Sequence, residues 1–390
     1  MLAWRQHAVV VGAGCAGLAM AVALDHVLPG DWRITVVDPT FRSASEKTWC
    51  FWGEVPEHLA PLVRKTWTKS RVAGPGWSRT DPLRQHPYHL VEGAAYERHH
   101  LERLRRSPRV RLRHGAVDAI CSRPHEGADV RIDGTTLPAR WVFQSVRRPP
   151  NATAGRTALA QHFGGWLVET QTPVFSPDRF TLMDFDAEQG DGVAFRYVLP
   201  LSETRALVEH TVFSRAPWAR TRYDAALRTW LDARTPSHRV ERREYGVIPM
   251  RDDELPQQTG HSIFNLGTVG GMTKPSTGYT FANVHRQVGH LCTTLLRRGR
   301  PRPLPSRPRR FAWYDALLLD VLARTPERGR PIFERLFQGH DVDGVLGFLD
   351  ERSSIPQEAS IFSSLPWAPF LAAASRRRAQ PRLALGPANP

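Results

Sequence analysis

The first forty residues alternate between apolar runs and a glycine-rich turn. Four consecutive apolar residues at 8–11 (AVVV) predict a short strand that is buried on both faces. A turn at 12–17 (GAGCAG) follows directly, and the apolar run at 18–24 (LAMAVAL) predicts a helix. A second apolar stretch at 33–37 predicts another strand. The order strand, glycine-rich turn, helix, strand is typical of the opening of a parallel α/β sheet.

The turn carries the spacing of a dinucleotide-binding loop. Gly12, Gly14 and Gly17 form a GxGxxG pattern, and Asp38 follows the second predicted strand, 21 residues after Gly17. Glycines permit a tight turn and the close approach of a pyrophosphate, the helix N-terminus faces the phosphates, and the acid accepts the ribose hydroxyls. A coincidental glycine-rich turn is the alternative, but the flanking elements favour a Rossmann-type site.

A second glycine-rich element lies far along the chain and belongs with the first. Residues 263–281 contain Gly267, Gly270 and Gly271, and a predicted helix follows at about 280–297. This is another strand–loop–helix N-terminus suited to anions. Together the two glycine-rich elements suggest a large cofactor that is contacted from both ends of the chain, and this favours FAD over NAD. Residues 99–113 predict a helix and an alternating strand that could extend the same sheet.

The middle of the chain changes to a period of two. Alternating runs at 193–201 and 206–213, with 171–175 and 244–250, predict an inserted antiparallel sheet. After a Pro/Arg-rich linker, apolar residues between 311 and 349 recur at helical spacing. The predicted fold class is therefore α/β: a Rossmann-type FAD-binding domain with a parallel sheet, an inserted antiparallel-sheet substrate domain and C-terminal helices.

The predicted domain boundaries follow these changes of period. They are 1–150 for the first part of the FAD-binding domain, with residues 45–95 partly contributing to the substrate side, 151–255 for the antiparallel substrate domain, 256–300 for the second part of the FAD-binding domain, 306–374 for the helical module and 375–390 for a disordered tail.

The composition excludes several classes of protein but does not indicate a function. The 390 residues are 41% hydrophobic and 23% charged, which excludes disorder, collagen and coiled coil. Four scattered cysteines without a CxxC pair predict neither a disulfide framework nor a zinc site, and fit a reducing cytoplasm. No apolar stretch approaches the ~20 residues of a bilayer span, and a strand beginning by residue 8 leaves no room for a signal peptide. No metal is expected, and His99 and His100 beside Glu102 are interpreted as a solvated helix face.

The charge is strongly positive and unusual in kind. The net charge is +15, and only four of the 53 basic residues are lysines. A GC-rich genome could explain the arginines, while the functional alternatives are nucleic acid and an anionic membrane surface. The sequence contains no zinc finger, RNA-binding aromatic motif or basic heptad helix. We therefore expect no nucleic acid, and peripheral contact with a membrane.

Several ordered segments resemble one family, the FAD-dependent lycopene β-cyclases of bacteria and plants. Besides the first glycine loop with Asp38, the matching segments are 47–52 (KTWCFW), 183–189 (MDFDAEQ), 195–202 (FRYVLPLS), 206–211 (ALVEHT), 245–250 (YGVIPM), 270–279 (GGMTKPSTGY), 348–351 (FLDE) and 365–370 (LPWAPF), so that the resemblance covers about 8–374. It implies a carotenoid biosynthesis enzyme that closes the ψ-ends of lycopene into β-rings without net redox change. It also implies bound reduced FAD, NADPH as reductant, and a cytoplasmic enzyme peripheral to the inner face of the cell membrane.

The resemblance also implies roles for individual residues. The family's catalytic acid matches Glu209, while the next position, acidic in many members, is His210 here. The family's MD-F segment gives Asp184 as a second catalytic candidate and Gln189 as its glutamine. Without the resemblance, Glu209 could equally be a solvent-side residue on an alternating strand, and the acids near Asp184 could cap a turn.

The chemistry of ring closure explains these residue types. A proton added to the C1=C2 double bond gives a tertiary cation, C5=C6 attacks it, and C6 then loses a proton. A carboxyl in an apolar strand stays protonated because burial disfavours its charged form. Aromatic faces stabilise carbocations without trapping them. The candidates for this substrate-binding role, each of which could instead be core, are Trp49, Phe51, Trp52, Phe195 and Tyr197.

Two other functions remain open from the sequence. A flavin-dependent redox enzyme, a monooxygenase or a prenyl or carotenoid reductase, would use the same glycine loops, but its product would differ in mass from lycopene. A non-enzymatic basic protein that binds nucleic acid would lack a yellow chromophore, and its binding would weaken steeply with salt.

Overall fold

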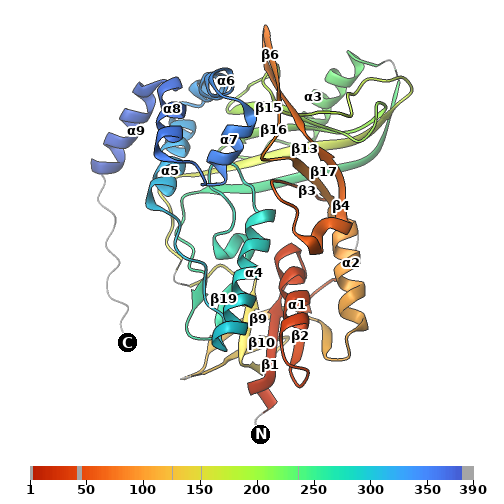
Figure 1. Ribbon diagram of the computed structural model, residues 1–390, viewed down its shortest axis with the longest axis vertical. Coiled ribbons are helices and arrows are strands. Elements are labelled where there is room, and N and C mark those ends of the chain that lie inside the picture. Colours follow the sequence, from red (N-terminus) through yellow and green to blue (C-terminus); the bar gives the residue numbers. More distant parts are fainter. Residues whose placement is uncertain (1–2, 42–45, 125, 151, 236, 380–390) are drawn as a thin grey trace. The chain divides into compact units, whose positions relative to one another are not determined.

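The computed structural model describes residues 3–41, 46–124, 126–150, 152–235 and 237–379. The chain forms two compact units whose segments alternate along the sequence. The first unit comprises Met1–Thr66, Pro87–Arg156 and Asp253–Ser306, and the second comprises Trp67–His86, Thr157–Asp252 and Arg307–Pro390. Figure 1 follows this alternation by colour.

The first unit is built on a six-stranded sheet in the order β18-β19-β12-β1-β2-β8. Its strands are β1 (His7–Val11), β2 (Arg33–Asp38), β8 (Val110–His114), β12 (Trp141–Gln144), β18 (Gln258–Thr259) and β19 (Ile263–Asn265). The pairs β1/β12, β1/β2, β2/β8 and β12/β19 are parallel, and the short edge strand β18 is antiparallel. The second glycine element thus follows β19 and joins the sheet that the N-terminus begins.

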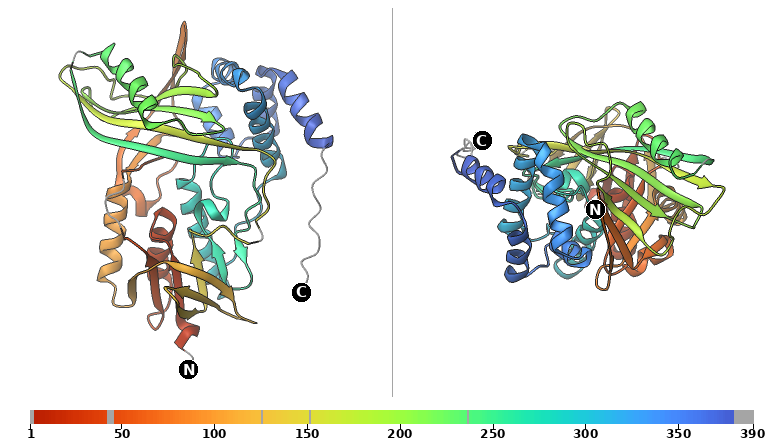
Figure 2. Two further views of the ribbon diagram at one scale, coloured as in Figure 1. Left: turned by 180° about the vertical axis from the view of Figure 1, so that it is seen from behind. Right: turned by 90° about the horizontal axis from the view of Figure 1, so that it is seen from above.

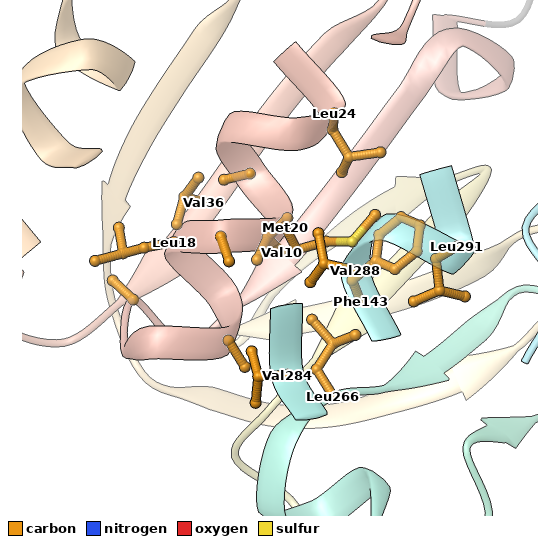
Figure 3. Close-up of a cluster of buried hydrophobic side chains, with 14 of the residues drawn as sticks. Val10, Leu18, Met20, Leu24, Val36, Phe143, Leu266, Val284, Val288 and Leu291 are labelled. Atoms are coloured by element: carbon orange, nitrogen blue, oxygen red, sulfur yellow. The ribbon is translucent and has the colours of Figure 1, made fainter. Parts of the chain in front are cut away.

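Both faces of this sheet are covered. Its helices are α1 (Cys15–Val27), α2 (Gly93–Arg106) and α4 (Phe281–Arg298). Ala8 and Val10 of β1 pack in a core with Leu18 of α1 and Val284 of α4, and Figure 3 shows this layer. Val9 and its alternate neighbours point the other way, into a core with a three-stranded sheet. Burial on both faces explains why these strands are apolar throughout.

Smaller elements complete the first unit. The sheet on its second face has the order β11-β10-β9, and another three-stranded sheet has the order β3-β7-β4. Their strands are β3 (Thr48–Trp52), β4 (Val63–Trp67), β7 (Tyr88–Glu92), β9 (Val117–Ser122), β10 (Ala128–Ile132) and β11 (Thr135–Ala139). The 3-10 helices are η1 (Ala3–Gln6), η2 (Glu57–Leu62) and η3 (Gly267–Gly270).

The second unit is built on a seven-stranded sheet in the order β17-β13-β16-β15-β14-β5-β6. Its strands are β5 (Lys69–Gly74), β6 (Trp77–Pro82), β13 (Ala158–Thr170), β14 (Phe180–Asp184), β15 (Val193–Pro200), β16 (Arg205–Ser214) and β17 (His238–Arg251). The pairing is antiparallel except between β14 and β5. Strand β13 therefore lies between β16 and β17, although it precedes both in the sequence.

Helices cover this sheet from two directions. Helix α3 (Arg220–Asp232) lies along one face of this sheet (Figure 2). It packs there against Val208 through Leu227 and Trp230. The C-terminal helices are α5 (Arg309–Arg324), η4 (Pro326–Arg328), α6 (Gly329–Gly339), α7 (Val342–Leu349), α8 (Ile355–Ser364) and α9 (Trp367–Ala379). Phe333 of α6 contacts Phe213, which points to the face opposite α3. Among the described residues, no helix combines the length and apolar character that crossing a bilayer requires.

The observed elements confirm most of the predicted pattern and correct some of it. The mixed α/β fold, the parallel sheet, the antiparallel sheet and the helices near 99–113 and 280–297 are confirmed. The predicted strand at 171–175 is wrong, because β13 ends at Thr170 and backbone bonds from Val174 and Phe175 to Glu203 hold a loop there. The tail does not begin at 375, because α9 continues to Ala379. Residues 380–390 lie outside the described residues.

Candidate active site

The first glycine turn has the close packing that its sequence predicts. Gly12 has φ of +96°, and a Cβ there would lie 2.5 Å from the Ser145 Oγ. A Cβ on Gly17 would lie 1.7 Å from the Gly12 carbonyl oxygen. A side chain at Gly17 would push α1 away from the turn, and one at Gly12 would collide with the residues that follow β12, so the turn itself requires both glycines.

Gly14 is different, because none of the residues that the structure describes fills the space beside it. A Cβ built on Gly14 would meet no atom within 4 Å. Gly14 is also the N-cap of α1, and no side chain of the described segments caps this helix end. The first N–H groups of a helix have no intrahelical acceptor and attract anions. The loop therefore offers open space and hydrogen-bond donors at the place where a dinucleotide would present its phosphates.

Asp38 ties this loop to the end of β2. Its Oδ2 accepts a hydrogen bond from the Ala13 backbone N–H at 2.8 Å, and its Oδ1 accepts from the backbone N–H groups of Thr40 and Phe41. Burial acts to raise the pKa of Asp38, but these backbone donors outweigh it and the pKa is lowered. Among the described residues Oδ2 has a single donor, so it retains a lone pair that could accept a sugar hydroxyl.

The second glycine element packs against the first helix. Gly267 has φ of +59°, and a Cβ there would lie 3.1 Å from the Ala16 Cβ of α1. A Cβ on Gly270 would lie 2.1 Å from the Asn265 carbonyl oxygen, and Gly271 has φ of +79°. Close contacts at Gly267 and Gly270 and the left-handed backbone at Gly267 and Gly271 thus fix the conformation of this element. The two glycine elements thus lie in the same unit although they are far apart in the sequence.

The acid proposed from the sequence lies in a row of residues across the sheet of the second unit. Tyr197 of β15 pairs with Glu209 of β16, and Glu209 pairs with Gly165 of β13. Gly165 in turn pairs with Glu244 of β17. Directly paired residues project from the same face of a sheet. The row therefore places two glutamates on one face, on either side of a position that has no side chain.

The two glutamates form a buried carboxyl pair. Glu209 is 7% exposed and Glu244 is 4% exposed. A hydrogen bond joins their side chains, and Arg242 lies 3.3 Å from the Glu244 carboxylate. Burial raises the pKa of Glu209 well above its usual value, and the charge of Glu244 raises it further, while Arg242 and the Thr211 hydroxyl act in the opposite direction. Burial and the neighbouring charge thus both favour the neutral form of the Glu209 carboxyl.

Apolar side chains surround this pair on the same face. Leu199, Leu207 and Leu167 form the next row in the register, and Phe195 pairs with Thr211 on the other side of Glu209. Leu199 and Leu207 are almost fully buried. The arrangement is an apolar environment around a carboxyl whose neutral form is favoured by burial, which suits proton transfer to an apolar substrate.

The lycopene cyclase protein family matches residues 8–375. The chain belongs to the lycopene cyclase family. It is also 28% identical over 302 residues to a lycopene beta-cyclase from Paracoccus sp. (strain N81106 / MBIC 01143), covering 70% of this chain and 69% of that protein.

Solved structures with a fold similar to that of this lycopene cyclase family member include a reductase-like protein and a halogenase in complex with FAD. A geranylgeranyl bacteriochlorophyll reductase-like protein from Thermoplasma acidophilum has a TM-score of 0.56 at 12% identity, over 96% of this chain and 99% of its own. The halogenase PltM, in complex with phloroglucinol and FAD, has a TM-score of 0.55 at 12% identity, over 96% and 93%. At these identities the likeness shows the fold.

The aromatic residues predicted to bind substrate in this family member fall in both units. In the first unit, Trp49 stacks on Phe281 with ring centres 5.5 Å apart, and Phe51 contacts the same ring. Both belong to the core around α1 and α4, while Trp52 contacts Tyr279. In the second unit, Phe195 and Tyr197 lie on the Glu209 face. The contacts of Trp49 and Phe51 account for them as core, and a substrate role for all five stays a prediction.

Asp184 and Gln189 do not join the carboxyl pair. Asp184 forms ion pairs at 3.7 Å with Arg71 and with Arg196, whose guanidinium lies over Trp230 on the α3 side of the sheet. A catalytic role for Asp184 stays a prediction. Gln189 bonds the backbone of Ala187 and Ala194 and so fixes its own loop.

His210 lies on the face opposite Glu209, as the alternation predicts. It is buried and stacks on Trp218 with ring centres 5.5 Å apart. Burial lowers its pKa to about 4. A neutral ring packed on α3's side of the sheet does not replace the second acid that many family members have. Glu244, which the sequence analysis missed, supplies a carboxyl beside Glu209 from another strand.

A histidine cluster in the first unit corrects one prediction. His99 is exposed, but His100 is buried and stacks on Tyr96, so it does not belong to a solvated helix face. The Tyr96 hydroxyl also contacts Nε2 of His285, and Nδ1 of His285 lies 3.1 Å from Nε2 of His58. Burial lowers the pKa of His100 to about 4 and that of His285 to about 3. These rings are therefore neutral in the folded protein.

Proposed function

We propose that this protein is a lycopene β-cyclase, which converts the ψ-end groups of lycopene to β-ionone rings without net redox change. It would act as an isomerase in carotenoid biosynthesis. The observation that carries the proposal is the Glu209 carboxyl, buried on an apolar face of the sheet where burial raises its pKa and favours its protonated form. An unactivated alkene requires a strong acid or one held away from water, and burial supplies the second.

The roles of the residues follow from the charge that develops. Glu209 would donate its proton to C2 of the C1=C2 bond and leave a tertiary cation at C1. Tyr197 pairs with Glu209 and Phe195 lies one row away, so each could present an aromatic face to that cation. The leucines of the same face exclude water, which would otherwise trap the cation as an alcohol.

FAD is the cofactor we propose for the first unit. Gly14 and the N-terminus of α1 would hold the pyrophosphate, Asp38 would accept the ribose hydroxyls, and the element at 267–271 would close the other side. The open space beside Gly14 fits this assignment. When bound in its reduced, anionic form, with NADPH as the reductant, the flavin would supply negative charge that stabilises the carbocation, a role that consumes no hydride.

We also propose that the protein docks on the inner face of the cell membrane, because lycopene is a hydrocarbon that resides in the bilayer. Trp367 and Leu371 lie one turn apart on α9, and each is 59% exposed. The net charge of +15 would attract anionic lipid, with about 1 kcal/mol from each arginine near the surface. Binding to anionic liposomes should weaken at high salt. Equal binding to neutral liposomes would contradict the electrostatic part of this proposal.

A redox flavoenzyme is the second candidate, because the solved structures with this fold include a reductase-like protein and a halogenase. Product mass separates the two functions. A cyclase gives products with the mass of lycopene and needs only catalytic amounts of reductant in the absence of oxygen. A reductase or monooxygenase shifts the mass by hydrogens or oxygen and consumes one reductant per turnover.

The deciding experiment is expression in a lycopene-accumulating bacterium, followed by chromatography of the pigments. Wild-type protein should give β-ring products, and Glu209→Gln should abolish them while retaining flavin absorbance. Glu241→Gln is the matched control, because Glu241 lies on the same strand as Glu244 but is held in ion pairs with Arg205 and Arg239. If Glu209→Gln keeps more than about a tenth of wild-type cyclisation, an effect below about 1.4 kcal/mol, Glu209 is not the essential acid.

A further inference from the structure

We infer that Glu209 and Glu244 work as one unit that holds a single exchangeable proton, with Gly165 providing the gap through which the two carboxyls meet. In this unit Glu209 donates the proton to the substrate. Glu244 is the positioning residue that keeps the shared proton on Glu209 before the reaction. The inference rests on the proposed function and deepens it, because it assigns the partner of the acid and the group that takes the proton back.

The geometry of the sheet makes this contact exceptional. Strands β16 and β17 are not neighbours, since β13 lies between them. Two strand spacings amount to about 9–10 Å, and a side chain on the intervening strand normally fills that distance. In the adjacent row, that side chain is Leu167. A Cβ on Gly165 would lie 2.9 Å from the Glu209 Cγ and 3.1 Å from the Glu244 Cγ. The missing side chain is therefore what lets the carboxyls meet.

The charges locate the proton within the pair. Two buried carboxylates cannot share a hydrogen bond unless one of them is protonated, because like charges at this distance repel strongly. Arg242 is 3.3 Å from Glu244, and the Glu209 side chain contacts the Thr211 hydroxyl. The guanidinium stabilises the negative charge on Glu244. The proton accordingly resides on Glu209, the member of the pair that lies between Tyr197 and Gly165.

The reaction balances on this unit alone. Glu209 gives its proton to C2, the C1–C6 bond forms from the C5=C6 electron pair, and the cation moves to C5. Loss of the C6 proton to the carboxylate then forms the C5=C6 double bond of the β-ring. C2 and C6 are both bonded to C1, so donor and acceptor positions lie close together. One proton leaves and one returns, with no oxidant or reductant.

Other ionisable groups near the pair are accounted for. On its own face they are Tyr197 of β15 and Arg242 of β17. Helix α5, which packs against β13, β16 and β17, carries Asp315 and Asp320, and both are held in ion pairs with arginines. Helix α6 pairs its own Glu334 with Arg330. The pH response of Glu209 should therefore follow Glu244 and Arg242.

The test uses the sign of a pH shift, measured on full-length flavin-loaded enzyme with lycopene in liposomes. Glu244→Gln removes the neighbouring charge and adds an amide donor, so Glu209 should ionise more easily. The alkaline limb of cyclisation against pH should move down by at least about one unit. Arg242→Met removes the cation and should move the same limb upward. Glu241→Gln and Arg243→Met are matched controls, since Arg243 lies over Trp166 on the other face, and should leave the limb in place.

Infrared spectra separate a failure of this inference from a failure of the proposed function. At neutral pH, the difference between wild type and Glu209→Gln should contain a protonated carboxyl band, which weakens in Glu244→Gln, whether or not lycopene is the substrate. If the protein does not cyclise lycopene but the band is present, the proposed cyclase function is wrong and the inference of a shared proton is retained. If the band is missing, or if both charge variants lower the rate without moving the alkaline limb, the shared proton is refuted and Glu244 is merely structural.

Discussion

Two glycines, Gly14 in the first unit and Gly165 in the second, illustrate different uses of a missing side chain. In the described part of the chain, no atom lies within 4 Å of a Cβ built on Gly14, so this space is available to a ligand. The space beside Gly165 is occupied by the side chains of Glu209 and Glu244. The first glycine leaves room for a molecule that binds, and the second leaves room for two groups of the protein itself to meet.

The difference lies in how far apart the cooperating residues are in the sequence. Gly14 acts with Gly12, Gly17 and Asp38, all in one strand–turn–helix–strand segment. Gly165 acts with residues of two other strands, and the strand order alone brings them together. Variants of these glycines should consequently fail in different ways, and the following predictions run from the largest effect to the smallest.

Replacing Gly17 should disrupt the first unit itself. In Gly17→Val, the Cβ would lie 1.7 Å from the Gly12 carbonyl oxygen, and backbone atoms cannot move aside as a flexible side chain can. We expect insoluble protein or a loss of more than about 3 kcal/mol in the free energy of unfolding, measured in urea. Gly30→Ala, where a Cβ meets nothing within 4 Å, is the control. Normal stability of Gly17→Val would show that the helix–strand contact is not tight.

Gly14→Val should separate cofactor binding from folding. The new side chain enters open space, so the unfolding free energy of the flavin-free protein should stay within about 0.5 kcal/mol of wild type. The same side chain would occupy the place proposed for the pyrophosphate, and purified protein should be colourless. Flavin absorbance relative to protein absorbance measures this. Stoichiometric flavin in Gly14→Val would refute the assignment of the loop.

Gly165→Ala should weaken catalysis more than stability. One methyl group between the Glu209 and Glu244 side chains forces them apart, and cyclisation should fall at least about tenfold, an effect of about 1.4 kcal/mol. Flavin content should not change. Gly246→Ala crowds Phe163 on the same face and controls for overpacking. Equal losses of activity in the two variants would mean that crowding, and not separation of the carboxyls, lowers the rate.

The smallest effect is a difference in how the two units respond to pH. Burial lowers the pKa of His285 to about 3 and that of His100 to about 4, against 6.5 in the unfolded chain. The contribution of these neutral rings to the free energy of unfolding is therefore fully present above pH 6.5, and it decreases as the pH falls toward 4. Burial raises the pKa of Glu209, so its contribution is complete below its unfolded pKa of 4.5 and falls as the pH rises through the folded value. The two effects have opposite slopes.

Variants should therefore change the pH slope of the unfolding free energy in opposite directions. Between pH 4.5 and 6.5, His285→Gln should make stability rise less with pH, and Glu209→Gln should make it rise more. Urea unfolding of flavin-free protein at several pH values measures both slopes, with His99→Gln as an exposed control. Slopes that change in the same direction would contradict the opposite pKa shifts.

The sequence determined the elements whose residues are contiguous. The order strand, glycine turn, helix and acid is complete by Asp38, because every contact in it spans a short segment. A period of two likewise fixed the face on which Glu209 lies relative to His210, since alternation is a property of one strand. Choosing Glu209 as the acid required the resemblance to a family as well, because alternation by itself does not distinguish a buried acid from an exposed one.

Only the tertiary structure decided which distant residues meet. Strand β13 was missed because Gly164 and Gly165 lie in its centre and glycine lowers strand propensity. Glu244 lies in a run of arginines and glutamates that, by itself, resembles a solvated edge. The order β17-β13-β16 puts that run beside Glu209 across the glycine. Strand order is set by how whole strands pair and pack, which no local pattern encodes, and so the carboxyl pair became visible only in the folded chain.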